Sequence, residues 1–308
     1  MPTGDRGFIP NNYLMDEPIT EFPVWQYQEG RIATSQDKVA VEEPLEIRLR
    51  GEPFQVLMRL PGWEKDLALG FLYTEGIVRD LNEVISMHFC GTATDPLLPP
   101  SVVDVQLTDA AWKRRGRRHL EVAYSSCGLC AKEAVSEICR TAAPVGSALT
   151  VRASWLLDCI GRIYQEQIVF QETGGTHGVA LATPEGAFYL LAEDVGRHNA
   201  MDKVIGRALL QRRDLSRMVV LLSGRISFEM ALKAIRAGIP ILAAVSAPTS
   251  MALNLAQDLN LTLVGFARNQ RLNIYTHPRR LTALAEKSNQ LKHMVEEGPH
   301  PSDHLTPG

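Results

Sequence analysis

No apolar run in this 308-residue sequence approaches the roughly 20 residues that a helix needs to cross a bilayer. The first residues, MPTGDRGFIPNNYLMDEPITEF, carry charges and prolines without an apolar core, so we expect no signal peptide. An excess of basic charge is also lacking, because the formal net charge is −3. That balance gives no argument for binding to nucleic acid or an anionic membrane. We therefore expect a soluble cytoplasmic protein that binds neither.

Cysteine is scarce, with five residues in the whole sequence. Without a secretory signal, this number indicates a reducing cytosol rather than a disulfide scaffold. Cys127 and Cys130 form a C-x-x-C in SSCGLC, but a structural zinc site normally needs four nitrogen or sulfur ligands and there is no second C-x-x-C. Zinc is therefore poorly supported, and we predict no metal ligands. Cys90 and Cys159 lie in apolar segments, and we predict that both pack as core residues.

The C-x-x-C pair precedes AKEAVSEIC, a predicted helix that Ser126 is placed to cap. A thiolate at a helix N-terminus is stabilised, so we expect the pKa of Cys127 to lie below the free value of about 8.5. A thiol of low pKa can accept sulfur as a persulfide and pass it on. The pair alone does not separate that role from redox chemistry.

The length of the chain suggests two domains, and the first half reads as strands with one helix. A hairpin is predicted for PLEIRLRGEPFQVLMRLP, a helix ending near Gly76 for KDLALGFLYTEGIV, and strands for SVVDVQLTD and RRHLEVAYS. The predicted division has loose termini at 1–27 and 296–308, a strand-rich domain at 28–123, a C-x-x-C segment at 124–145 and an α/β domain at 146–290.

The second half alternates apolar strands with amphipathic helices, which predicts a largely parallel sheet covered on both faces. SWLLDCIGRIYQ is predicted as a helix capped by Ser154, and IVFQETGG as a strand. SFEMALKAIRAG is predicted as a helix between Ser227 and Gly238. The fold class is therefore α/β, with an α+β N-terminal part and a three-layer α/β/α C-terminal domain.

Polar residues follow the strands that enter LLSGRISFEM, AVSAPTSMA and GFARNQR. Ligands of parallel α/β sheets bind at the carboxyl ends of strands, where unpaired helix N–H groups favour phosphate or carboxylate. Arg268 and Arg271 suit a planar or phosphorylated ligand. The stretch EDVGRHNAMDK places seven polar or charged side chains at another strand-to-helix junction, too many to be dismissed as surface.

Six segments together resemble one family, the FdhD formate dehydrogenase accessory sulfurtransferases. The segments are SSCGLC, TGGTHGVAL, EDVGRHNAMDKVIGRAL, LSGRISFEM, KAIRAGIPILAAVSAPTS and GFAR, in the family's order, with LALGFLYTEGI as a weaker match. One departure is Gly178, where we expect a small residue such as alanine after the histidine. This difference should leave the chemistry unchanged.

The resemblance implies that a cysteine desulfurase loads sulfur onto Cys127 as a persulfide, with Cys130 as its partner. The sulfur then goes to the molybdenum cofactor in its bis(molybdopterin guanine dinucleotide) form, which is delivered to formate dehydrogenase. GDP is expected to act as an analogue of the nucleotide half, and the protein to form a homodimer. The candidate cofactor-binding residues are Phe266, Ala267, Arg268, Asn269, Gln270, Arg271, Ser223, Gly224, Arg225, Ser246, Thr249, His177 and His198.

The family's C-terminal domain resembles the cytidine deaminase fold, which raises the question of deamination. Zinc deaminases need H-x-E at one helix start and P-C-x-x-C at another. The corresponding junctions here are RHNAM and SGRISFEM, with no glutamate two residues after His198 and no cysteine in the second. Deamination is therefore disfavoured. Two alternatives to sulfur transfer stay open: a chaperone that only binds the cofactor and, less favoured, a zinc-dependent hydrolase.

Overall fold

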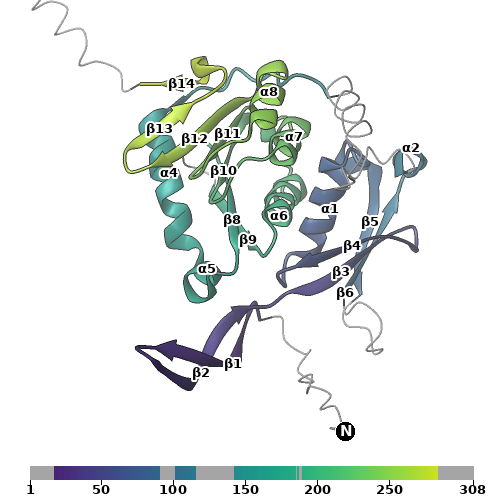
Figure 1. The fold of residues 1–308 in the computed structure, drawn as a ribbon. Coiled ribbons are helices and arrows are strands. Elements are labelled where there is room, and N and C mark those ends of the chain that lie inside the picture. The colour runs from purple at the N-terminus through teal and green to yellow at the C-terminus, as the bar shows by residue number, and fades with distance from the viewer. Residues whose placement is uncertain (1–16, 91–100, 116–141, 185, 187–188, 284–308) are drawn as a thin grey trace, which may run out of the picture.

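The computed structural model describes residues 17–90, 101–115, 142–184, 186 and 189–283. Two bodies make up most of it, and a long hairpin extends from them (Figure 1). The first body contains β3 (Glu43–Leu49), β4 (Glu52–Arg59), α1 (Glu64–Thr74), the short helix η1 (Leu81–Glu83), β5 (Val84–Cys90), β6 (Ser101–Leu107) and α2 (Asp109–Arg114). Its four strands pair in the order β4-β3-β6-β5, and α1 packs on this sheet.

Local sequence accounts for the hairpin and helix of the first body. Arg50 and Gly51 both have positive φ, 53° and 82°, which is the geometry of a tight two-residue hairpin turn. The alternate residues Leu45, Ile47 and Leu49 are fully buried and meet the apolar face of α1. The predicted hairpin, helix and SVVDVQLTD strand are confirmed. The predicted strand RRHLEVAYS lies at 117–125, outside the described residues.

The second body is built on a six-stranded sheet. Its elements are β7 (Val151–Arg152), α4 (Ala153–Glu166), α5 (Ile168–Thr173), β8 (His177–Ala182), β9 (Tyr189–Asp194), α6 (Arg197–Leu210), η3 (Leu215–Arg217), β10 (Val219–Leu222), α7 (Phe228–Arg236), β11 (Ile241–Ala244), α8 (Ser250–Asp258), β12 (Thr262–Arg268), β13 (Arg271–Ile274), η4 (Pro278–Arg280) and β14 (Leu281–Thr282). The six strands lie in the order β13-β12-β11-β10-β8-β9, while β7 and β14 form a separate parallel pair.

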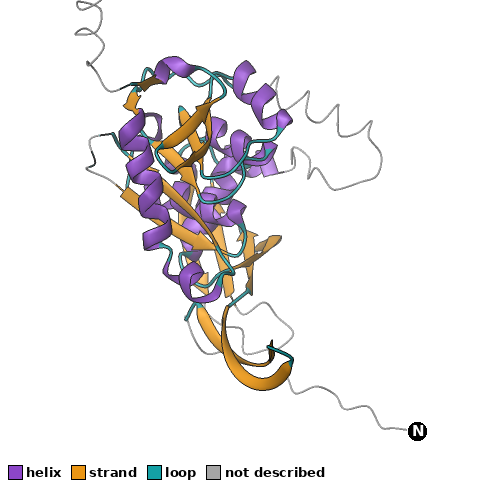
Figure 2. Ribbon diagram, turned by 60° about the vertical axis from the view of Figure 1, so that its left-hand side comes forward, coloured by secondary structure: helices purple, strands orange, loops and turns teal. Residues whose placement is uncertain are grey.

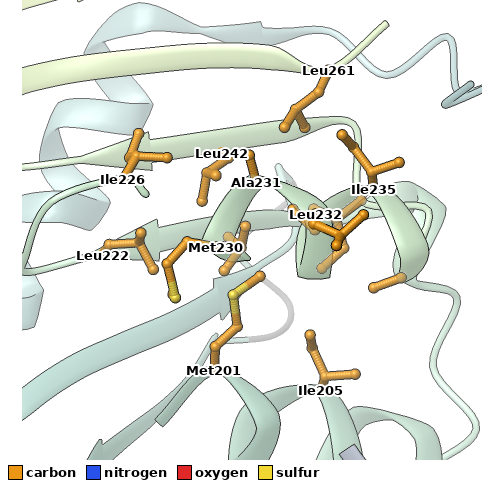
Figure 3. Close-up of a cluster of buried hydrophobic side chains, with 14 of the residues drawn as sticks. Met201, Ile205, Leu222, Ile226, Met230, Ala231, Leu232, Ile235, Leu242 and Leu261 are labelled. Carbon is orange, nitrogen blue, oxygen red and sulfur yellow. The ribbon is translucent and has the colours of Figure 1, made fainter. Parts of the chain in front are cut away.

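Alternation along the buried strands gives this sheet two apolar faces. Leu222 and Leu242 contact the cluster formed with α6, α7 and α8, in which Met201 and Met230 are also buried (Figure 3). Their chain neighbours on the strands, such as Leu221 and Ala243, belong to a second cluster with α4. The α/β class and the three-layer C-terminal arrangement are thus confirmed; the likeness to the cytidine deaminase fold stays a prediction.

The sheet is mixed rather than largely parallel, so that prediction is wrong. β10 is parallel to β11 and β11 to β12, but β8 runs antiparallel to both β9 and β10, and β13 runs antiparallel to β12. The reason is connectivity. β8 and β9, and likewise β12 and β13, are joined by short turns, and a short turn returns the chain in the opposite direction.

Two local predictions in the second body are also wrong. IVFQETGG forms helix α5, not a strand, because the carboxylate of Glu193 accepts hydrogen bonds from the backbone N–H groups of Val169 (2.9 Å) and Phe170 (2.8 Å). This carboxylate satisfies donors that a helix start otherwise leaves unpaired. Helix α4 begins at Ala153, so Ser154 lies inside the helix and does not cap it.

The first 27 residues were predicted to be poorly ordered, and this is wrong for residues 17–27, which the structure describes. β1 (Ile19–Gln28) and β2 (Arg31–Ala40) pair along their whole length, and the turn residues Glu29 and Gly30 have positive φ. A domain boundary at residue 28 therefore falls inside this hairpin. The hairpin extends below both bodies (Figures 1 and 2), and Lys38 of β2 pairs with Glu172 of α5 at 2.6 Å. In the part of the chain that the structure describes, no helix combines the length and apolarity needed to span a membrane.

Candidate functional site

Three predicted junctions meet at one edge of the six-stranded sheet. Because β10, β11 and β12 are mutually parallel, their carboxyl ends share that edge. The junctions are tied together by backbone hydrogen bonds, from Phe266 N–H to the Ser246 carbonyl (3.1 Å) and from Thr249 N–H to the Ile226 carbonyl (2.9 Å). Helix α7 begins after Ser227 and helix α8 after Thr249, whose hydroxyl accepts from Ala252 N–H. The edge thus carries two helix N-termini side by side.

The turn between β12 and β13 presents two arginines at this edge. Asn269 and Gln270 have positive φ, 51° and 59°, and close a two-residue turn. Arg268 and Arg271 are paired directly across the hairpin, and both are exposed. Side chains of like charge at paired positions repel each other, so an anion bound between them would relieve that repulsion. Ala267 is fully buried and holds the strand to the core rather than facing a ligand.

The antiparallel direction of β8 brings further polar groups to the same edge. His177, the first residue of β8, is paired with Asp194, the last residue of β9, and lies beside the end of β10. Gly178 N–H donates to the Ser223 hydroxyl at 2.9 Å. A Cβ on Gly224 would lie 3.6 Å from Nδ1 of His177, so the glycine backbone packs against the imidazole. Burial and the positive charge of Arg197 lower the pKa of His177.

His198 and Arg197 occupy the first turn of α6. Burial, together with the positive charges of Lys233 and Arg197, lowers the pKa of His198 to about 4, so its imidazole is neutral near pH 7. Nε2 of His198 and Nε of Arg197 are shielded from solvent, and neither has a hydrogen-bond partner among the described residues. Buried polar atoms are normally paired, so unpaired ones beside a sheet edge are candidates for binding a ligand.

The other charged residues of EDVGRHNAMDK have structural roles. Glu193 caps α5 and accepts from the Thr176 hydroxyl at 2.6 Å. Asp194 is fully buried, and one of its oxygens pairs with Nζ of Lys203 at 2.8 Å. It also accepts from the Leu60 N–H of the first body (3.2 Å). The cluster is therefore more than surface, and most of its side chains hold the framework of the site in place.

A second polar network joins the two bodies behind the site, and it was not predicted from the sequence. Nζ of Lys233 contacts both carboxylate oxygens of Asp202, at 2.9 and 2.8 Å, and the Thr74 hydroxyl at 2.8 Å. Asp66 of α1 and Arg207 of α6 form a two-pronged pair at 2.6 and 2.8 Å. Acidic and basic residues within the amphipathic helices were the one available sign of this network in the sequence. Their partners could not be identified, because they lie up to 159 positions away.

Sequence comparison identifies the family. The FdhD/NarQ family model matches residues 40–282. A sulfur carrier protein FdhD from Streptomyces coelicolor is 43% identical over 274 residues, which cover 85% of this chain and 95% of that protein. Another from Saccharolobus solfataricus is 37% identical over 268 residues, 85% of this chain and 98% of that one. The chain belongs to the FdhD/NarQ family.

A solved structure shares the fold of this family member. It is that of a putative formate dehydrogenase accessory protein from Desulfotalea psychrophila, with a TM-score of 0.70 and 24% sequence identity. The match covers 86% of this chain and 100% of that one. The arrangement described above is therefore found in a second protein of distant sequence.

Most of the predicted site residues lie in two parts of this sheet edge. His177, His198, Ser223 and Gly224 lie at the β8–β10 part of the edge, and Ser246, Thr249 and the hairpin 266–271 at the β11–β13 part. Arg225 is exposed in the loop between them. Cys127 and Cys130 lie outside the described residues, so their roles stay predictions. Among the residues described, no group of three or more His, Cys, Asp or Glu side chains is placed to hold a metal ion.

Gly178 has a packing explanation. A Cβ at this position would lie 2.5 Å from Cδ of Gln167, which is itself buried at 2% exposure. The alanine expected there does not fit while Gln167 keeps this position. The glycine at position 178 thus leaves room for the large side chain of Gln167 beside it.

Proposed function

We propose that this protein is a sulfur carrier required for formate dehydrogenase activity. Sulfur from a cysteine desulfurase is accepted on Cys127 as a persulfide and transferred to the bis(molybdopterin guanine dinucleotide) form of the molybdenum cofactor. The observation that carries the proposal is the 43% identity, over 95% of its length, to a protein named as a sulfur carrier. The protein acts in the cytoplasm as a homodimer, with the desulfurase and the dehydrogenase as its partners.

The loading step requires only a thiolate at Cys127. That thiolate attacks the terminal sulfur of the desulfurase persulfide, a new S–S bond forms on Cys127, and the desulfurase thiolate leaves. No net oxidation or reduction occurs, so no further reactant is needed. Thiolate rather than thiol is the nucleophile, which is why a helix-start position for Cys127 favours this step. Cys130 protects or resolves the persulfide.

The cofactor is the substrate of this reaction, and the sheet edge supports its binding. A guanine dinucleotide carries a planar base and phosphates. The hairpin 266–271 carries two exposed arginines at paired positions, and the planar guanidinium groups suit the base or a phosphate. Helices α7 and α8 start beside this hairpin, and their N-terminal N–H groups suit phosphate. GDP is therefore a suitable analogue for binding experiments.

The decisive experiment compares Cys127→Ala with Cys159→Ala in cells that lack the native gene. Cys127→Ala should abolish formate dehydrogenase activity with an unchanged unfolding curve, whereas Cys159→Ala should retain activity. Mass spectrometry of the purified protein, incubated with a desulfurase and cysteine, should find an additional sulfur atom on Cys127. Full activity of Cys127→Ala would instead favour a chaperone that binds the cofactor without carrying sulfur.

A further inference from the structure

The β1–β2 hairpin carries an exposed apolar face near its tip. The register pairs Trp25 with Thr34 and Tyr27 with Ile32. Because alternate pairs of an antiparallel ribbon point the same way, these four side chains lie on one face. Trp25, Tyr27 and Ile32 are 77%, 72% and 69% exposed. Single exposed apolar residues are normal on a protein, but three large ones gathered on one face mark an interaction surface.

The base of this hairpin is fixed, and its tip is not covered. Lys38 of β2 pairs with Glu172 of α5 at 2.6 Å. Ala40 packs against Gly175, where a Cβ on the glycine would lie 3.1 Å from the Cβ of Ala40. Each strand has 10 residues, so the ribbon is about 34 Å long. A two-stranded hairpin is marginally stable by itself in water, so this one calls for a surface that covers it.

The sheet of the first body exposes a second apolar surface. Leu45 of β3 faces the core that this sheet forms with α1. The next residue, Glu46, is paired with Val56 of β4, and Pro44 is paired with Met58, so these side chains lie on the opposite face. Val56 and Met58 are both exposed. The tip of the hairpin points away from the first body (Figure 1), so the two exposed faces of one chain do not meet.

We propose that the hairpin is an arm that clasps a second copy of this chain, with Trp25, Tyr27 and Ile32 packed on the face of the other copy that carries Val56 and Met58. The proposal rests on the proposed function for the homodimer and names the surfaces that meet in it. A twofold axis repeats the contact, so each copy both gives an arm and receives one.

The contact area favours a second copy over an unrelated protein. A two-stranded ribbon is roughly 10 Å wide, so one face of this hairpin covers about 340 Å² and buries about 700 Å² counted on both surfaces. Two reciprocal arms bury about 1,400 Å², which lies within the range of stable specific interfaces. One arm on a different protein buries half of that, which is the range of weak contacts.

The test measures the size of the full-length protein by sedimentation velocity over a dilution series. Trp25→Glu on the arm and Met58→Lys on the sheet face each place a charge in the contact. Each lost contact should weaken the dimer at least about tenfold, and a symmetric dimer loses it twice, so Kd should rise about a hundredfold or more. Tyr164→Ser is the matched control, because it removes an aromatic side chain of similar exposure, 66%, from α4. It should dimerise as the wild type does.

Mixing the two variants tests the reciprocal geometry and shows that both are folded. A mixed dimer has one intact contact, from the arm of the Met58→Lys chain to the sheet face of the Trp25→Glu chain. In its other contact a glutamate faces a lysine. The equimolar mixture should therefore dimerise at least about tenfold more tightly than either variant alone. No gain on mixing would overturn the reciprocal exchange of arms.

The outcomes distinguish this inference from the proposed function. Variants that dimerise like the wild type would overturn the arm and leave the homodimer standing. A wild type that stays monomeric at high concentration would overturn both, whereas sulfur loading of Cys127 is measured separately. Weaker binding of Trp25→Glu to the desulfurase or the dehydrogenase, with unchanged dimerisation, would assign the hairpin to that protein and overturn the clasp.

Discussion

Gly70 of α1 and Gly206 of α6 lie at the crossing of the two helices that join the bodies of this protein. A Cβ on Gly206 would be 1.9 Å from the Asp66 carbonyl oxygen, and a Cβ on Gly70 would be 1.9 Å from the Asp202 carbonyl oxygen. The backbones are therefore in direct contact, and no other residue fits at either position. This contact sets the place of α6, whose first turn carries Arg197 and His198.

We expect Gly206→Ala to destabilise the protein by about 1–3 kcal/mol or more, because the methyl group must push two helix backbones apart. Urea unfolding at pH 7 measures the difference. Gly161→Ala is the matched control, since it lies in helix α4 with open space around its Cβ position. It should stabilise the protein by about 0.5–1 kcal/mol through reduced backbone entropy. Equal stability of the two variants would show that the helices are not in contact.

Asp202 neutralises the buried ammonium group of Lys233. We expect Asp202→Ala to cost about 3 kcal/mol, because it leaves the buried Lys233 ammonium with only a longer carboxylate contact, to Glu75 at 3.8 Å. Lys38→Ala breaks an ion pair with Glu172 in which both side chains are exposed, and should change the unfolding free energy far less than Asp202→Ala does. Both are measured by urea unfolding.

The double variant Asp202→Leu with Lys233→Met provides a check on this explanation. Removing both charges eliminates the desolvation cost, so the double variant should be more stable than Asp202→Ala. A double variant that is less stable than the single one would mean that the network contributes through packing rather than charge.

Arg268 is expected to contact the guanine nucleotide. Arg268→Ala should weaken GDP binding by about ten- to a hundredfold, since one charge-assisted contact contributes roughly 1.5–3 kcal/mol. The measurement is calorimetric titration of GDP and ADP, with Arg31→Ala on the β1–β2 hairpin as the control. GDP binding that is unaffected by Arg268→Ala would exclude this contact, and equal affinity for ADP would remove the preference for guanine.

Cys159 should be unreactive in the native protein. It is 6% exposed in α4, and burial raises the pKa of its thiol to about 11, although Arg162 opposes the shift. At pH 8 the thiol is therefore protonated, and thiol reagents require the thiolate. Mass spectrometry after a brief iodoacetamide treatment should find Cys127 modified and Cys159 unmodified until urea is added. Rapid native labelling of Cys159 would show that α4 opens readily.

Turn residues and hydrophobic periodicity were enough to predict most elements of the fold. The β3–β4 hairpin needs Arg50 and Gly51 at positive φ, and the stop of α1 needs Gly76 at a φ of 75°, which are properties of short segments. Helix α5 was mispredicted because the group that caps it, Glu193, is 24 positions from Val169. Strand direction in the sheet was likewise misjudged, since a pattern of buried residues is the same in either direction.

From the sequence alone, the residue types suited to the site could be chosen, and Ser223 and Ser246 could be placed just after strand ends. Which charged residues are available at the site depends on contacts between segments that are far apart in the sequence. Asp194 forms an ion pair with Lys203, and Asp202 forms one with Lys233. Arg197 and His198 each keep a buried nitrogen without a partner among the described residues. The physical reason is that a buried charge must find its partner in space, and the partners of Asp202 include Thr74, 128 positions away in another body.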